Sequence, residues 1–304
     1  MGPQMADTEE KARTIRLERL RTMVEKHLDL APAALETLLS ELRIGEAQSD
    51  LWERLHAAAA RDDQELELAE AYRKATVDRR LKQLPPAAAA DLLMHAADFS
   101  QGVIGDGDGA EIYLRAVLQI IPNHAEAFAR LERRFDAAGD KRQLVELYAS
   151  VVATPPRRPD EMANRIVNEI AQLTAKSRLS DDACKRLMAL VPVSLPMLGV
   201  LEAHCLKTGR PRLACELLEE AIEKHGLTET RIIDQRRRLI DLYLGEAAQP
   251  EKSITHIEIL LLRDPNDART RDAGRHLLSN REVATRAAEA LQTARRKSQL
   301  PGAS

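Results

Sequence analysis

The sequence predicts an all-α protein assembled from antiparallel pairs of helices. Ala, Leu, Glu and Arg are abundant among the 304 residues, while aromatic residues make up only 3% and Gly and Pro are sparse. The abundant residues are strong helix formers, and the β-branched or aromatic runs that favour strands are missing. An internal period and regularly spaced apolar residues divide the chain into such pairs.

A period of 34 residues sets the length of one helix pair. At this offset Gly105 matches Gly139, and Pro122 matches Pro156. Apolar residues three and four positions apart lie between these markers, as expected for one face of a helix. A glycine turn therefore joins the two helices of a unit, and a proline closes the unit because proline interrupts a helix.

The first elements, in residues 8–48, are expected to form an amino-terminal helical cap. An array of helix pairs needs a cap because its first unit would otherwise expose an apolar face. One helix is expected within residues 8–28, and a second runs from Pro32 to Leu42. Residues 1–7 are interpreted as a tail or a residual cloning sequence. The apolar residues close to one face of the first helix are Ile15, Leu17, Leu20 and Val24.

About seven helix pairs are expected to occupy residues 49–296, and residues 297–304 form a carboxy-terminal tail. Three of the pairs are clear. Their apolar positions are Trp52, Leu55, Ala59, Leu68, Tyr72 and Ala75; Phe128, Leu131, Phe135, Leu144, Tyr148 and Val151; and Leu198, Leu201, Cys205, Ala214, Leu218 and Ala221. The weaker pairs carry Ala110, Leu114 and Val117; Ala163, Ile166, Ile170, Ala183, Leu187 and Leu190; Leu239, Leu242, Tyr243, Ile257 and Leu260; and Leu278, Ala287, Leu291 and Ala294.

This spacing resembles that of the tetratricopeptide repeat. The resemblance covers residues 49–296 and implies a right-handed α-solenoid, and residues 52–72 are similar to segments of large bacterial proteins of this family. One position departs from the family, which places a small residue four after the leading large one. His56, Glu132 and Glu202 stand there, so either the helices cross at a wider distance or these side chains tilt towards solvent. HAT and Sel1-like repeats are alternatives.

The resemblance implies a non-enzymatic scaffold or adaptor that binds a peptide or a helix of a partner protein in a concave groove. The groove would be lined by first-helix residues of the clear units. A self-associating structural component of a larger assembly is the alternative. The partner-binding candidates are Asp50, Glu53, Arg61, Glu126, Arg133, Asp136 and Lys207.

The stretch GDGDG at 105–109 is the motif most similar to a metal or phosphate site. A calcium loop starting at Asp106 would need oxygen ligands at its third, fifth and twelfth positions. Those positions hold Asp108, Ala110 and Val117, and the two apolar residues are needed for packing. We therefore interpret the stretch as a turn in which Asp caps the next helix. No metal, cofactor or catalytic constellation is expected.

Charge and hydropathy exclude further classes. The formal net charge of −3 argues against nucleic-acid binding, which needs a concentrated basic surface. The densest basic segment, 231–239, points its arginines in different directions around a helix, which favours a solvated face over an acidic partner. No apolar run approaches the ~18 residues of a membrane span, and no signal peptide is recognised, so a cytoplasmic protein with reduced, buried cysteines is expected.

Overall fold

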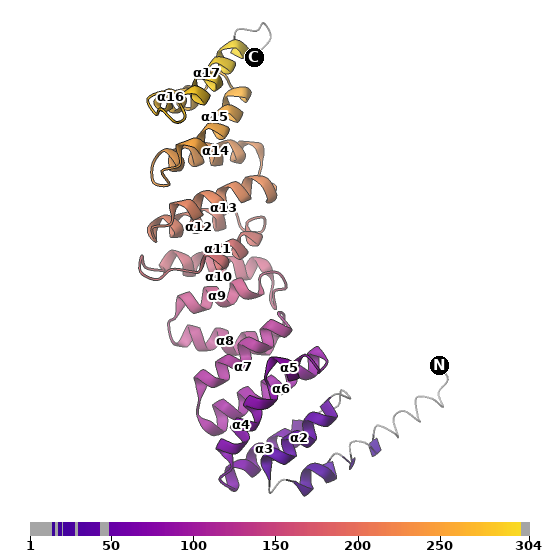
Figure 1. The fold of residues 1–304 in the computed structure, drawn as a ribbon. Coiled ribbons are helices and arrows are strands. Elements are labelled where there is room, and N and C mark those ends of the chain that lie inside the picture. The colour runs from indigo at the N-terminus through magenta and orange to yellow at the C-terminus, as the bar shows by residue number, and fades with distance from the viewer. Residues whose placement is uncertain (1–13, 16–17, 20, 28–29, 43–48, 299–304) are drawn as a thin grey trace, which may run out of the picture. The chain divides into compact units, whose positions relative to one another are not determined.

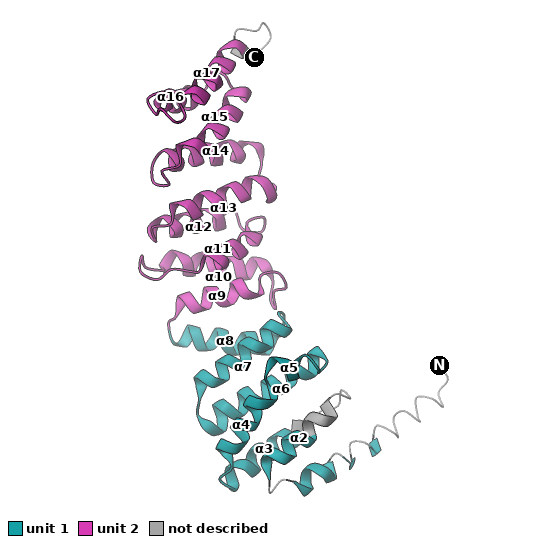
Figure 2. Cartoon of the chain, viewed as in Figure 1, with its two compact units in different colours: residues 1–138 teal, residues 139–304 magenta. Residues whose placement is uncertain are grey.

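The computed structural model describes residues 14–15, 18–19, 21–27, 30–42 and 49–298. Every regular element in these ranges is a helix, which confirms the all-α prediction (Figure 1). The chain divides into two compact units, Met1–Ala138 and Gly139–Ser304 (Figure 2). The boundary between the units falls at one of the predicted glycine turns.

Unit 1 contains the amino-terminal helices and the first helix pairs. Within it α2 packs on α4, α6 packs along α7, and α7 packs on α8. The short helix α5 and the π-helix η1 were not predicted. Its elements are α2 (Ala31–Leu42), α3 (Ser49–Arg61), α4 (Glu65–Ala75), α5 (Asp78–Leu81), α6 (Pro86–Phe99), η1 (Ser100–Ile104), α7 (Gly107–Ile120) and α8 (Ala125–Ala137).

Unit 2 continues with helices of similar length. Helices that are consecutive in sequence pack on each other, as α12 does on α13 and α14 does on α15, and α15 also packs on α17, the second helix after it. Its elements are α9 (Lys141–Val151), α10 (Pro159–Gln172), α11 (Asp181–Leu187), the 3₁₀-helix η2 (Met188–Leu190), α12 (Pro196–Lys207), α13 (Pro211–Lys224), α14 (Glu229–Leu244), α15 (Pro250–Arg263), α16 (Ala268–Leu277) and α17 (Ala284–Ser298).

Proline and glycine mark the ends of these helices. Helices α6, α10, α12, α13 and α15 have proline at or next to their first residue, where its missing N–H costs nothing. Gly139, which follows α8, and Gly209, which follows α12, adopt φ angles of +66° and +71°. Because side chains disfavour this left-handed region, glycine ends the helix there at little cost.

The predicted apolar stripe forms the core. In the first clear pair, Trp52, Leu55, Leu68 and Tyr72 are all at most 1% exposed. The other stripe positions are buried almost throughout, and the three cysteines are buried free thiols. The stripe is wrong at Leu278, which is 44% exposed, because α16 ends one residue earlier and buries Leu277 instead.

Part of the amino-terminal segment lies within the described residues. Helix α2 ends at Leu42 as expected, and Val24 is buried. Ile15 was predicted for the same apolar face but is 65% exposed, so that assignment is wrong. Leu17 and Leu20, predicted for this face as well, lie outside the described residues.

His56, which stands where the tetratricopeptide repeat has a small residue, does not tilt towards solvent. His56 turns inward, where its Nε2 atom lies 2.7 Å from the hydroxyl of Tyr72 and its ring centroid lies 5.0 Å from that of Phe99. Glu202, at the same position of a later pair, accepts a hydrogen bond of 2.6 Å from Arg238 of α14. At this position of the repeat, His56 and Glu202 thus each form a hydrogen bond with a residue of another helix.

The GDGDG stretch is a turn followed by a helix cap, as predicted. Gly105 ends η1 with a φ of +76°, and the Asp106 carboxylate accepts a 2.8 Å hydrogen bond from the Gly109 N–H at the start of α7. A Cβ atom on Gly109 would lie 2.4 Å from Oδ2 of Asp106 and 2.7 Å from Oγ of Ser100. Glycine at 109 thus leaves room for the capping side chain.

Replacing Gly109 with Ala is expected to displace the Asp106 cap and to lower stability by about 1–2 kcal/mol, the usual range for a lost cap. Gly102→Ala is the matched control, because a Cβ there has no neighbour within 4 Å. Thermal unfolding of both variants measures the difference. Millimolar calcium should leave both melting temperatures unchanged, and a calcium-dependent rise would contradict the interpretation of this stretch as a turn.

Candidate functional site

A polar groove lies between α7 and α8 in unit 1, with a volume of about 650 Å³. It contains two of the residues that the sequence singled out for partner binding, Glu126 and Arg133. Polar residues of α7, α8 and η1 surround them. The charged and amide side chains that line it are Gln101, Glu111, Glu126, Arg130, Arg133 and Arg134.

The amphipathic pattern of α8 presents these side chains. His124 caps the helix by accepting a 3.2 Å hydrogen bond from the Ala127 N–H. Ala127, Phe128, Leu131 and Phe135 are buried on one face. Residues three and four apart lie on the same side of a helix, so Glu126, Arg130, Arg133 and Arg134 follow one another along the groove.

Arg130 and Arg134 hold the walls of the groove together. Arg130 donates to Asp98 at 2.5 Å and to Gln101 at 2.9 Å, and only 14% of its side chain is exposed. Arg134 donates to Glu111 at 2.9 Å and also pairs with Asp108. Both guanidinium groups are therefore committed to neighbouring elements, where they fix the shape of the site.

Arg133 and Glu126 face the groove without such partners. The Nε atom of Arg133 donates only to the Ala129 carbonyl of its own helix, at 3.2 Å. Among the described residues, none forms a hydrogen bond or ion pair with the carboxylate of Glu126. The two opposite charges are seven residues apart on one helix, a separation of roughly 10 Å at 1.5 Å per residue. A bound segment could satisfy both groups.

The other predicted site residues do not join this groove. Asp50 pairs with Arg21 at 2.5 Å, and Arg61 pairs with Asp62 at 2.5 Å. Glu53 is exposed on α3, and Asp136 is exposed near the end of α8. Lys207 belongs to unit 2, where its Nζ donates to the Leu173 carbonyl at 2.6 Å. The structure thus brings together two of the seven candidates.

Sequence reasoning missed the supporting arginines of the groove. Arg130 and Arg134 follow Glu126 at helical spacing, so the periodicity placed them on the same side. Nothing in the sequence indicated that Gln101 would meet Arg130, because that contact depends on η1.

The basic segment 231–239 is largely neutralised within unit 2. Arg237 pairs with Asp267 at 3.0 Å, and Arg238 pairs with Glu202 at 2.6 Å. Arg236 contacts Nδ1 of His256 at 3.1 Å. The three arginines point in different directions, as predicted, and two of them form ion pairs with neighbouring helices.

Comparison with known protein families and with curated proteins finds no match to this chain. None of the described helices is both long enough and apolar enough to cross a membrane. Within the same residues, no group of three or more His, Cys, Asp or Glu side chains is arranged to hold a metal ion.

Proposed function

We propose that the chain is a protein-binding scaffold, a right-handed α-solenoid of tetratricopeptide-like helix pairs. The 34-residue period, the glycine turns and the packing of successive helices within each unit support this architecture. A bacterial, cytoplasmic adaptor is the role that best fits the sequence resemblance. The ligand is a peptide or a helix of another protein.

One observation carries the proposal: the groove between α7 and α8 holds two exposed, opposite charges that make no ion pair with the described residues. Arg133 and Glu126 project from a helix whose opposite face is anchored by Phe128 and Leu131. Because the backbone of α8 is already fixed by this packing, binding has to order only side chains and not the helix itself. A partner segment with an acidic residue near Arg133 and a basic residue near Glu126 would complete charge-assisted hydrogen bonds.

Arg133→Glu is expected to weaken the partner by about 1–3 kcal/mol, the usual range for a hydrogen bond to a charged group. The melting temperature should hardly change, because Arg133 bonds only to its own helix. Partners are first captured from cells of the native organism and identified by mass spectrometry. Their affinities for the wild-type protein and the variant are then measured by calorimetry.

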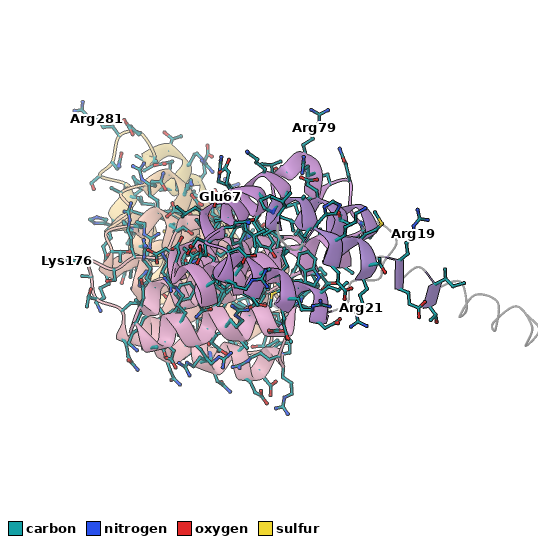
Figure 3. The ribbon with its side chains drawn as sticks, turned by 90° about the horizontal axis from the view of Figure 1, so that it is seen from below. Arg19, Arg21, Glu67, Arg79, Lys176 and Arg281 are labelled. Carbon is teal, nitrogen blue, oxygen red and sulfur yellow. The ribbon has the colours of Figure 1, made fainter. Side chains whose placement is uncertain are left out.

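Arg79→Glu is the matched control for this measurement. Arg79 belongs to the same unit and projects away from the ribbon (Figure 3), and the charge change is identical. The proposal fails if a captured partner responds to Arg79→Glu and ignores Arg133→Glu. Loss of self-association in the Arg133 variant, with no heterologous partner, would favour the structural role instead.

A further inference from the structure

Two buried thiols meet between α11 and α12 in unit 2. The side chains of Cys184 and Cys205 are fully buried, and their thiols form a hydrogen bond with each other. The two residues are 21 positions apart in sequence and lie on different helices. The third cysteine, Cys215, is a buried free thiol of α13. The chain therefore holds one pair of thiols in contact and a third thiol that serves as an internal comparison.

A buried guanidinium group lies beside this pair. Arg210 precedes α13, and only 10% of its side chain is exposed. Its Nη1 atom donates to the Asp181 carboxylate at 2.6 Å and to the Leu179 carbonyl at 2.9 Å. Its Nη2 atom is buried and has no hydrogen-bond partner among the described residues. Part of the positive charge of Arg210 is therefore available to the two sulfur atoms, and it acts on both of them.

These neighbours make the two thiols chemically unequal. The hydrogen bond from the Cys205 thiol and the charge of Arg210 lower the pKa of the Cys184 thiol. The same hydrogen bond raises the pKa of the Cys205 thiol. Burial, which acts alone on an ordinary thiol of the core, raises the pKa of Cys215 to about 11. Because the thiolate is the reactive form of cysteine, Cys184 is the nucleophile of the pair and Cys205 is the second sulfur within its reach.

We propose that Cys184 and Cys205 are a site of reversible oxidation by peroxides, at which an intramolecular disulfide forms between α11 and α12. The Cys184 thiolate attacks one oxygen of hydrogen peroxide, an S–O bond forms, the O–O bond breaks, and the departing hydroxide leaves as water with the thiol proton. The Cys205 sulfur then attacks the Cys184 sulfur. The S–S bond forms, the S–O bond breaks, and the second thiol proton leaves in a second water. The two sulfur atoms together lose the two electrons that the peroxide gains.

Local opening of α11 gives peroxide access to the pair. Neither cysteine side chain is exposed, so the sulfur atoms are reached only when the structure around them opens. Helix α11 has seven residues and passes directly into the 3₁₀-helix η2. Its first residue, Asp181, is 67% exposed at the side chain and pairs with Arg210. Short peripheral segments open at a lower free-energy cost than a whole unit, so the oxidation does not require unit 2 to unfold.

Peptide mapping of the native full chain tests this inference without any substitution. The chain is treated with hydrogen peroxide, its free thiols are alkylated in denaturant, and it is digested with trypsin. The three cysteines then lie on separate peptides, residues 179–185, 187–207 and 213–224. We expect the peptide of Cys184 to be joined to that of Cys205, and Cys215 to be alkylated. Dithiothreitol should restore three free thiols.

The chain unfolded in urea is the matched control, because sequence separation alone decides there which cysteines meet. Cys205 and Cys215 are 10 positions apart, and closing this short loop costs less entropy than closing the longer one between Cys184 and Cys205. The unfolded chain should therefore form mainly the disulfide between Cys205 and Cys215. If the native chain gives this same product, oxidation follows unfolding and the inference is wrong.

Two variants test the separate roles of the sulfur atoms. In Cys205→Ala the reaction should stop at the sulfenic acid of Cys184, which is labelled by dimedone. In Cys184→Ala the labelling should be at least about tenfold weaker, because the remaining thiols are largely protonated. Cys215→Ala should form the disulfide as the wild type does. Circular dichroism checks that each variant is folded.

The contribution of Arg210 is tested by the rate of disulfide formation. Arg210→Gln removes the charge and should slow the reaction about threefold for each unit by which the pKa of Cys184 rises, since the loss of thiolate is partly offset by its greater nucleophilicity. Arg210→Lys keeps the charge and should react faster than Arg210→Gln. The inference fails if Cys184 in the native wild type stays unreacted. It also fails if Cys184 is oxidised to the sulfinic acid without bonding to Cys205, because the two sulfur atoms then do not reach each other.

Discussion

Lowering the pH from about 7 to about 4.5 is expected to remove several kcal/mol from the free energy of unfolding. The cause is a set of histidines that are held neutral in the folded chain. Burial lowers the pKa of His56 to about 4, assisted by the nearby His95. Burial also lowers the pKa of His95 to about 4. In unit 2, burial and the adjacent Arg210 lower the pKa of His204 to about 4.

The direction of this effect follows from proton binding. In the unfolded chain these imidazoles titrate near pH 6.5, so below that pH the unfolded state binds protons that the folded state rejects. Stability is therefore complete above pH ~6.5 and falls as the pH drops towards ~4. One pKa unit corresponds to about 1.4 kcal/mol, which gives up to about 3 kcal/mol for each histidine.

Neighbouring rings modify the contribution of His95. Its ring stacks on Trp52 with centroids 4.4 Å apart. An imidazolium gains about 1 kcal/mol from the face of an indole, which offsets part of the cost of charging His95. His56 has no indole of this kind and should show the larger individual effect.

Urea unfolding followed by circular dichroism at pH 7, 6 and 5 measures the slope. The double variant His56→Gln, His95→Gln should give a flatter dependence on pH, whatever its stability at pH 7. His276→Gln, which changes an exposed histidine of α16, should keep the wild-type slope. Equal stability of the wild type at pH 7 and pH 5 would show that these imidazoles bind protons in the folded chain as readily as in the unfolded chain.

Truncation of Trp52 is expected to have the second large effect. This side chain is fully buried in unit 1, stacked on His95 and with its ring centroid 6.3 Å from that of Tyr72. Trp52→Ala should cost about 3–5 kcal/mol, because the lost contacts and the remaining cavity both destabilise the folded state. Since the chain divides into two compact units and Trp52 belongs to the first, the unfolding transition of the variant should broaden or split.

Trp52→Phe keeps an aromatic ring in the core. The indole Nε1 is buried and has no hydrogen-bond partner among the described residues, so Phe leaves a smaller cavity than Ala and also removes an unsatisfied donor. Trp52→Phe is therefore expected to lose much less stability than Trp52→Ala in urea unfolding followed by circular dichroism. Unchanged stability in both variants would show that Trp52 is not a core anchor.

The helix pairs could be predicted from the sequence because each depends on signals within a few dozen residues. The spacing of Trp52 and Leu55 reports the buried face of a helix, and Gly105 and Gly139 report the turns. These signals are local properties of the backbone and of hydrophobic burial. They are less exact at helix ends: Leu278 was predicted to be buried, but α16 ends at Leu277 and buries that residue instead.

The site was less predictable because its side chains form hydrogen bonds and ion pairs with residues of other helices, and those contacts depend on how the helices pack. Periodicity placed Arg133 and Lys207 at comparable positions, yet only Lys207 meets a backbone carbonyl of a neighbouring segment. Nothing in the sequence indicated the π-helix η1, so the hollow that η1 lines together with α4 and α7 was not predicted. Leu66 and Ile112, which also line this hollow, are large apolar residues outside the predicted apolar faces of the helices.

The ion pairs between neighbouring helices have a consequence for folding kinetics. Arg130 and Asp98 are 32 residues apart in sequence, and Arg237 and Asp267 are 30 apart. Partners this close require only short loops to be closed, so contact order is low and the entropic barrier to each step is small. Within each unit, a helix pair can therefore dock onto the one before it soon after synthesis, while the rest of the chain is still being translated.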